Sequence, residues 1–207
     1  MRKPFRHPHP ILHLADLAAE PVEQFRRWHA EAERTVPLAE AMTLATVDPE
    51  GAPDARMVLL KGFGPDGFRF FSSYESAKAA QLTADPRAAL VVYWRELDRQ
   101  VRVRGPVERL GSGDSDAYFA GRPRDSQLGA WASPQSRPIE SRAALDERLH
   151  EAECRFGGDE VPRPDFWGGF LLRHQTVEFW QGQQARLHDR FLYRREGENW
   201  AIERLGP

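Results

Sequence analysis

The spacing of hydrophobic residues changes once near the start of the chain, from a helical period to a strand period. In residues 20–34 ("EPVEQFRRWHAEAER"), Val22, Phe25 and Trp28 recur at helical spacing, and Pro21 suits the first position of a helix. After this segment, apolar residues alternate with polar ones or form short runs between turn-forming residues. The pattern therefore predicts an N-terminal helix followed by a mostly β structure.

Short turns join most of the apolar runs. Residues 48–51 ("DPEG") and 64–67 ("GPDG") have the composition of tight turns, and residues 196–199 ("EGEN") precede the last run. In residues 99–110 ("RQVRVRGPVERL"), valines alternate with arginines, which is typical of a strand with one buried face. We expect about seven strands, drawn from residues 41–48, 54–63, 67–74, 88–94, 99–110, 161–180, 186–195 and 200–205.

Helix-prone segments interrupt these strands. They lie in residues 76–86, 113–122, 126–133 and 140–156, and we expect about four helices in total. Hairpin-length connections favour an antiparallel barrel over a parallel sheet, so the predicted fold is mainly β with flanking α-helices. The chain contains no repeat and no linker, which favours one domain. It also contains no glycine-rich loop of the kind that binds phosphate.

Composition narrows the classes of function. All but three of the 29 basic residues are arginine, and the net charge of −2 gives no general attraction for nucleic acid. Cys154 is the only cysteine, so a disulfide framework is excluded within the chain. No apolar run approaches the ~20 residues that span a bilayer, and we expect a cytoplasmic protein. His7, His9 and His13 lack ligands that would complete a shell, so we expect no metal site.

The stretch "RLHDRF" places unusual charge beside aromatic residues. If it forms a strand, Arg186, His188 and Arg190 share one face, because side chains two positions apart point the same way. Three such groups repel one another unless an anion lies between them. One interpretation is a solvated strand face; the other, favoured by Trp180 on the preceding strand, is a site for an anionic aromatic ligand.

A second candidate lies in "YFAGRPRDSQLGAW". Tyr118 and Arg122 are spaced to share a helical face, and Ser126 follows the break at Pro123. Two hydroxyls and a guanidinium at this spacing suit a phosphate group. The alternative is that Arg122 and its neighbour Arg124 pair with the nearby acids Asp125 and Asp116 on the surface.

A third candidate consists of cations around the first hairpins. Arg56 and Lys61 bracket an apolar strand, while Ser76 begins a predicted helix that has Lys78 in its first turn. A lysine is unfavourable there unless an anion offsets it, and a helix N-terminus attracts anions. These patterns together predict a small phosphorylated aromatic ligand, or two, held by scattered cations.

At these residues the sequence resembles the pyridoxine/pyridoxamine 5'-phosphate oxidase family, a group of FMN-dependent enzymes with a split-barrel fold. The resemblance covers nearly the whole chain, in family order. The matching stretches are "PVEQFRRW", "RMVLLKGF", "SAK", "RQVRVRG", "YFAGRPRDSQLGAWASPQS", "FWGGF", "EFWQG" and "RLHDRFLY".

The resemblance implies a homodimer with FMN at the subunit interface. Its FMN-binding residues would be Arg56, Met57, Val58, Leu59, Lys61, Phe71, Ser72, Ser76 and Lys78 from one subunit, with Gln100, Gln135, Ser136, Trp180 and Arg190 completing the site, partly from the other. The substrate phosphate would contact Lys61, Tyr118, Arg122 and Ser126. Catalysis would involve Arg186 and His188, which would lie over the pyridine ring and contact the substrate. Arg2 would also contact the substrate, from a mobile N-terminal lid in residues 1–20. A single domain would follow in residues 21–207.

The reaction implied by the resemblance is the oxidation of pyridoxamine or pyridoxine 5'-phosphate to pyridoxal 5'-phosphate, with O2 reduced to hydrogen peroxide. Two departures from the family pattern stand out: Ala77 replaces an arginine, which predicts weaker FMN binding, and Phe5 replaces a tyrosine in the lid. The alternatives are a related FMN oxidase of another ring compound, as in phenazine biosynthesis, and a non-catalytic carrier of flavin or pyridoxal phosphate.

Overall fold

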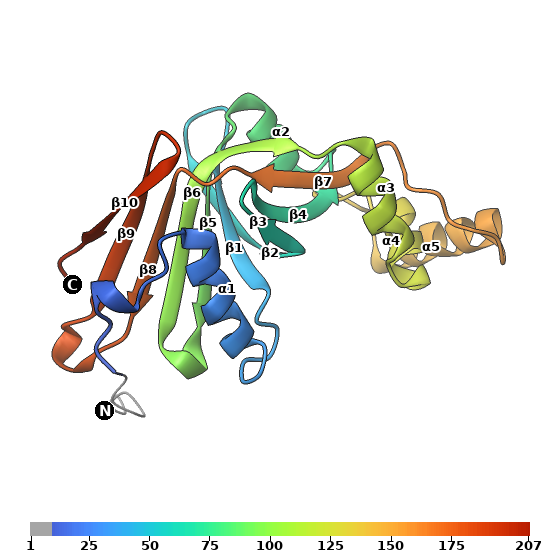
Figure 1. The fold of residues 1–207 in the computed structure, drawn as a ribbon. Helices are drawn as coiled ribbons and strands as arrows, with labels where there is room; N and C mark the ends of the chain where they lie inside the picture. The colour runs from blue at the N-terminus through green and yellow to red at the C-terminus, as the bar shows by residue number, and fades with distance from the viewer. Residues whose placement is uncertain (1–9) are drawn as a thin grey trace.

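A computed structural model describes residues 10–207, and Figure 1 shows them as a curled antiparallel sheet with a helix on one face and a helical group at one end. The α-helices are α1 (Pro21–Ala32), α2 (Ala77–Ala84), α3 (Ser112–Ala120), α4 (Arg124–Ala132) and α5 (Arg142–Phe156). The strands are β1 (Ala41–Val47), β2 (Pro53–Leu59), β3 (Gly62–Gly64), β4 (Gly67–Ser73), β5 (Arg87–Trp94), β6 (Arg99–Arg109), β7 (Trp167–Leu172), β8 (Thr176–Gln181), β9 (Asp189–Glu196) and β10 (Asn199–Arg204).

The predicted antiparallel class is confirmed, but the expected numbers of elements are wrong. The described residues form ten strands and five α-helices. The three residues of β3 are too few to show a period, and the apolar run near residue 175 is two strands, β7 and β8, divided at Arg173–Gln175. Sequence periodicity does not resolve either feature.

The long strand β6 links the two parts of the sheet. It pairs with β5 from Arg99 to Pro106, with β8 from Arg99 to Arg104, and with β7 from Val107 to Arg109. At Gly105, where the partner changes, an added Cβ would lie 1.9 Å from the carbonyl oxygen of Arg173. A glycine is therefore needed at the point where β6 passes from one partner to the next.

Two apolar clusters hold the fold together. In the larger, α1 packs on the sheet through edge-to-face contacts of Trp28 with Phe179 and of Phe25 with Phe68, with ring centroids 5.2 and 5.0 Å apart. The smaller cluster joins α3, α4 and α5 around Phe119 and Trp167. Burial of these rings is the main favourable term in folding. In residues 10–207, no helix is both long and apolar enough to cross a bilayer.

The segment before α1 packs against the last strands. The backbone N–H of Leu12 donates to Asp189 at 3.0 Å, and the hydroxyl of Tyr193 donates to the carbonyl of Ala18 at 2.7 Å. Arg204 donates to the Leu12 carbonyl and to Asp189. These bonds fix residues 12–18, within the predicted lid segment, beside β9 and β10. Arg2 and Phe5 lie outside the described residues.

Candidate active site

A pocket of about 210 Å³ gathers many of the residues predicted for cofactor and substrate binding. It is lined by Met57, Val58, Leu59, Lys61, Phe71, Ser72, Lys78, Tyr118, Arg122, Gln135 and Trp167. Strands β2 and β4, helices α2 and α3 and the start of β7 supply most of them. None of these lining residues is acidic, although three of them are cations. An anion is the ligand that this charge distribution favours.

Arg122 carries the unsatisfied polar atom of this pocket. Its Nη1 atom is buried and has no hydrogen-bond partner among the described residues. The guanidinium carbon lies 4.5 Å from the centre of the Trp167 ring, and burial lowers the pKa of Arg122. A buried guanidinium nitrogen without an acceptor is costly, so this atom is arranged for an anionic partner.

The surface pairing considered for Arg122 and Arg124 is wrong. Asp116 pairs with Arg163 at 2.6 Å, and Arg124 donates to the backbone carbonyls of Gly157 and Asp159. Tyr118 faces Phe71 instead of the surface, with ring centroids 3.7 Å apart and the rings nearly parallel. Burial raises the pKa of Tyr118, which keeps its hydroxyl protonated and able to donate.

Lys78 lies in the first turn of α2, as predicted, and is buried. Its Nζ donates to the Ser72 hydroxyl at 3.1 Å, and that hydroxyl donates to the Gln135 side-chain oxygen at 2.9 Å. Burial lowers the pKa of Lys78, and the nearby charge of Arg56 lowers it further. Two cations close enough for one to lower the pKa of the other favour a doubly charged anion such as phosphate between them.

The remaining residues of this predicted set have different positions. The charge of Arg56 lowers the pKa of Lys78, but Arg56 does not line the pocket. Ser76 is fully buried and donates to the carbonyl of Ser73 at 2.8 Å, so its hydroxyl is engaged within the protein. Ser126 is half-buried in α4 and Ser136 is exposed with a φ of 69°; neither lines the pocket. Trp167 was not singled out from the sequence, although it belongs to the "FWGGF" motif.

A second group of predicted residues lies on β6, β8, β9 and the loop before β9, away from this pocket. Gln100 is opposite Trp180 in the ladder, and Trp180 is opposite Arg190. Arg190 donates to Glu178 at 2.9 Å and to the Gly206 carbonyl at 2.8 Å. In Figure 1, β8 and β9 are at one end of the molecule and α3 is toward the other. One chain therefore carries two separate parts of the predicted site.

The interpretation of "RLHDRF" as one strand is wrong. Strand β9 begins at Asp189, and Arg186 ends a short 3-10 turn in which Ala185 and Arg186 both have positive φ values of 55° and 62°. The left-handed turn breaks the alternation that the sequence pattern assumed. Arg186 is exposed, His188 is half-buried, and only Arg190 of the three belongs to the strand.

The loop before β9 fixes the orientation of His188. Its Nδ1 accepts a hydrogen bond from the backbone N–H of Gln183 at 3.0 Å, so the neutral ring carries its proton on Nε2. Burial, with the charges of Arg186 and Arg190, lowers the pKa of His188. The ring lies beside Trp180, with centroids 4.6 Å apart. At neutral pH this arrangement presents a neutral imidazole that donates from Nε2.

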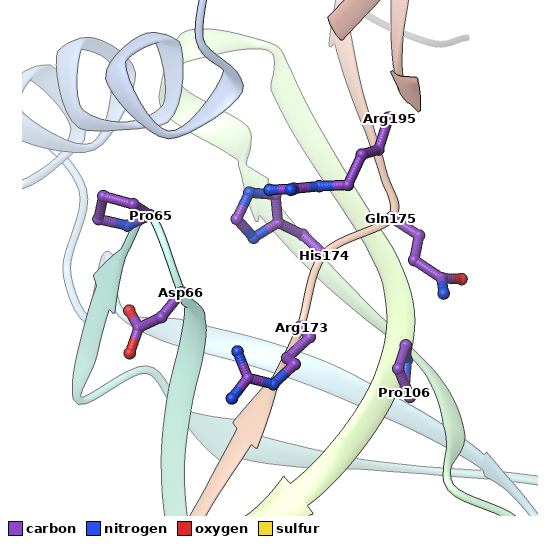
Figure 2. Close-up of a pocket in the computed structure, with 7 residues that line it drawn as sticks. All are labelled: Pro65, Asp66, Pro106, Arg173, His174, Gln175 and Arg195. Atoms are coloured by element: carbon purple, nitrogen blue, oxygen red, sulfur yellow. The ribbon is translucent and has the colours of Figure 1, made fainter. Parts of the chain in front are cut away.

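Another hollow, of about 310 Å³, lies between the β3–β4 turn and the β7–β8 connection and is lined by none of the predicted residues (Figure 2). Its charged groups already have partners: Arg173 bonds Glu108 at 2.6 Å, Asp66 bonds Arg69, and Arg195 lies 4.9 Å from the Trp200 ring centre. His174 is buried there and stacks on Trp200. This hollow lacks the unsatisfied cation that marks the other pocket.

Comparison with known proteins identifies the chain. The profile described as "Pyridoxamine 5'-phosphate oxidase" matches residues 28–154, and that described as "Pyridoxine 5'-phosphate oxidase C-terminal dimerisation region" matches residues 167–207. The chain belongs to the pyridoxine/pyridoxamine 5'-phosphate oxidase family. Among family members, the chain is 55% identical to the pyridoxine/pyridoxamine 5'-phosphate oxidase of Rubrobacter xylanophilus, over 91% of this chain and 87% of that protein. It is 53% identical to that of Azorhizobium caulinodans, over 92% and 91%.

Solved structures agree with the family's split-barrel fold. PhzG from Burkholderia lata 383, solved in complex with tetrahydrophenazine-1-carboxylic acid, superimposes with a TM-score of 0.89 at 30% identity, covering 95% of this chain and 98% of that one. A pyridoxamine 5'-phosphate oxidase-related, FMN-binding protein from Nostoc punctiforme gives a TM-score of 0.75 at 22% identity, covering 92% and 100%. The predicted fold, a split barrel with flanking helices, is confirmed.

Proposed function

We propose that this chain is an FMN-dependent oxidase that converts pyridoxamine 5'-phosphate or pyridoxine 5'-phosphate to pyridoxal 5'-phosphate. The observation that carries this proposal is the pocket around Arg122, which combines three cations, a buried guanidinium nitrogen without a partner, and stacked aromatic rings. A phosphorylated ring compound fits all three features. Relatives with more than half of their aligned residues identical bear the name of this activity, which supports it.

The cofactor supplies the redox chemistry. FMN, held through its phosphate by Arg56 and Lys78, would supply the acceptor for the hydride that leaves the substrate carbon C4'. O2 would be the final oxidant, reduced to hydrogen peroxide by those two electrons together with the proton that the substrate releases. The alcohol substrate thereby becomes the aldehyde directly. The amine substrate becomes an imine, which water hydrolyses to the aldehyde and ammonia.

Substrate binding falls to the residues around Arg122. Arg122 and Lys61 neutralise the substrate phosphate, and the protonated hydroxyl of Tyr118 donates to it, with Ser126 at its edge. Arg56 and Lys78 neutralise the phosphate of the cofactor. Holding both anions fixes the two rings with respect to each other, which makes the reaction effectively unimolecular.

A second copy of the chain completes the site in this proposal. Trp180, Arg186 and His188 lie outside the pocket of their own chain, and the region that contains them matches the family's C-terminal dimerisation region. We infer a homodimer in which each chain brings these residues over the other's pocket. Closed two-fold symmetry then produces two equal sites.

The second chain's residues act on the substrate ring. Arg186 orients the ring so that C4' faces the hydride acceptor. His188 donates from Nε2 to a polar group of the substrate, because its Nδ1 is already occupied by the Gln183 N–H. Together they exclude water from the reacting face.

The test is the visible absorption spectrum of the purified protein, followed by anaerobic addition of pyridoxamine 5'-phosphate. We expect a flavin spectrum that bleaches, and one peroxide per turnover once air is admitted. A flavin spectrum that does not bleach would indicate a carrier. Equal turnover of an unphosphorylated analogue, or turnover only of a compound such as the tetrahydrophenazine-1-carboxylic acid found in complex with PhzG, would indicate an oxidase of another ring compound.

A further inference from the structure

Arg56 is held by an unusually complete set of acceptors on three elements. Its Nη1 donates to the Thr46 hydroxyl at 2.5 Å and to the Leu44 carbonyl at 3.3 Å, both on β1. Its Nη2 donates to Asp54 on β2 at 2.5 Å and to Gln81 on α2 at 2.8 Å. The guanidinium therefore cannot rotate without breaking several charged hydrogen bonds.

Gln81 is the centre of this network. Its side-chain oxygen accepts from both Arg56 and the Thr46 hydroxyl, which is 2.6 Å away, and its amide nitrogen donates to Asp54 at 2.9 Å. Gln81 and Thr46 are buried, with 8% and 2% of their surface exposed. A buried amide whose oxygen and nitrogen are both engaged has one orientation, so it defines where the guanidinium lies.

The network places Arg56 beside a second cation. Gln81 and Lys78 both belong to α2, so the helix that carries the pocket lysine also carries the residue that fixes Arg56. Arg56 lowers the pKa of Lys78, although Asp54 lies close enough to offset part of its charge. Fixing two cations near each other is unfavourable in itself, and a bound dianion removes the penalty.

We propose that Thr46, Asp54 and Gln81 are positioning residues that hold Arg56 against Lys78 and so form the two-cation site for the phosphate of the flavin. This inference rests on the proposed function and adds to it three residues that do not line the pocket. It also explains how a chain with the exposed Ala77 at the start of α2, in place of the family arginine, retains a phosphate site.

The test compares FMN with riboflavin, which has the same ring and no phosphate. Gln81→Met keeps the volume of the side chain and removes its hydrogen bonds, and Thr46→Val removes only the hydroxyl. Binding to the apoprotein is measured by quenching of flavin fluorescence. We expect the Kd for FMN to rise about 10-fold in Gln81→Met and about 3-fold in Thr46→Val, with the Kd for riboflavin unchanged within about 2-fold.

Asp54→Asn and Gln24→Met complete the design. Asp54→Asn keeps an acceptor and removes the charge, so we expect it to weaken FMN binding less than Gln81→Met does. Gln24 is also buried, and its side-chain oxygen accepts from the Ala18 N–H, away from Arg56 and Lys78, so Gln24→Met should leave both affinities unchanged. The KM for pyridoxamine 5'-phosphate at saturating FMN should stay constant in all variants; a selective rise would assign the network to the substrate phosphate.

Equal weakening of FMN and riboflavin binding in Gln81→Met and Thr46→Val, or no weakening of either, would overturn the inference. If Gln81→Met does not fold, Thr46→Val and Asp54→Asn decide the matter, because both preserve side-chain shape. Failure of the unchanged protein to bind FMN at all would instead contradict the proposed function.

Discussion

The pocket around Arg122 and the loop before β9 contain the same residue types in opposite states. In the pocket, Lys78 is buried and Arg122 is half-buried, and one buried guanidinium nitrogen of Arg122 has no partner among residues 10–207. On the loop, Arg186 is exposed and has left-handed backbone geometry. The contrast agrees with the proposal that one chain supplies the anion-binding half of the site and a second chain supplies the other half.

We expect the largest effect, a loss of kcat, from a substitution on the exposed loop before β9. Replacing Arg186 with alanine is expected to lower kcat for pyridoxamine 5'-phosphate about 100-fold, because the substrate ring loses the side chain that orients C4' for hydride transfer. FMN content should not change, since the cofactor phosphate is held elsewhere. Steady-state kinetics and the flavin absorbance of the same preparation measure both quantities.

Arg194→Ala is the matched control for that experiment. Arg194 is an exposed arginine on β9 whose nearest acid, Glu203, is 3.8 Å away. Its loss should leave kcat and flavin content unchanged. Comparable losses of activity in both variants would mean that Arg186 acts only through the surface charge of this region.

A substitution in the pocket around Arg122 should mainly weaken substrate binding. Arg122→Ala is expected to raise the KM for pyridoxamine 5'-phosphate about 30-fold, which corresponds to about 2 kcal/mol for a charged hydrogen bond, with a smaller effect on kcat. Arg124→Ala, two residues further on, removes bonds to the carbonyls of Gly157 and Asp159. It should lower stability and leave KM unchanged; the reverse pattern would contradict the assignment of Arg122.

A substitution near Lys78 should increase the affinity of the pocket for FMN. Ala77→Arg is expected to tighten FMN binding about 10-fold, because it adds a cation beside Lys78 at an exposed position where a long side chain meets no obstacle from burial. Titration of apoprotein with FMN measures this directly. An Ala77→Arg variant that binds FMN no more tightly than the parent would show that the missing arginine costs nothing here.

The smallest predicted effect concerns the pH dependence of stability and comes from His174, which lies outside the pocket and outside the loop before β9. Burial lowers the pKa of His174 to about 4, mainly by desolvation, so the unfolded chain takes up a proton more readily than the folded one as the pH falls below the normal histidine value. Stability should therefore fall by about 1 kcal/mol between about pH 7 and about pH 5.5 from this group.

His174→Phe keeps a ring against Trp200, which is 5.2 Å from the His174 ring, and removes the titration. Denaturant unfolding at the two pH values should show a smaller pH dependence in this variant, with kcat and KM unchanged at neutral pH. An identical pH dependence in both proteins would rule out His174 as its source.

How far the sequence predicts this molecule depends on whether the information is local. The alternating valines of β6 and the helical spacing of Phe25 and Trp28 are local patterns, and they predict the antiparallel sheet and α1 correctly. The change of partner at Gly105 depends on a contact with Arg173, far along the chain, and no periodicity reveals it. The positive φ values at Ala185 and Arg186 likewise break a strand pattern that the residue types alone support.

The candidate site shows the same division. Family motifs place Lys78, Tyr118 and Arg122 in sequence, and the fold brings them to one pocket. The sequence does not single out Gln81, because a glutamine in a helix is not distinctive until its hydrogen-bond partners on β1 and β2 are known. The residues that bind ligands are thus more visible in the sequence than the residues that position them.

The central claim, that each site combines the pocket of one chain with the β9 loop of another, is tested most directly by mixing two impaired variants and assaying them at a substrate concentration well below the KM of Arg122→Ala, where both have little activity. Arg122→Ala and Arg186→Ala chains, co-expressed with different affinity tags, should form mixed dimers in which one of the two sites has both arginines intact. We expect roughly a quarter of the unmodified activity for an equal mixture of randomly paired chains. A mixture no more active than its two components, although mixed dimers are present, would contradict the claim.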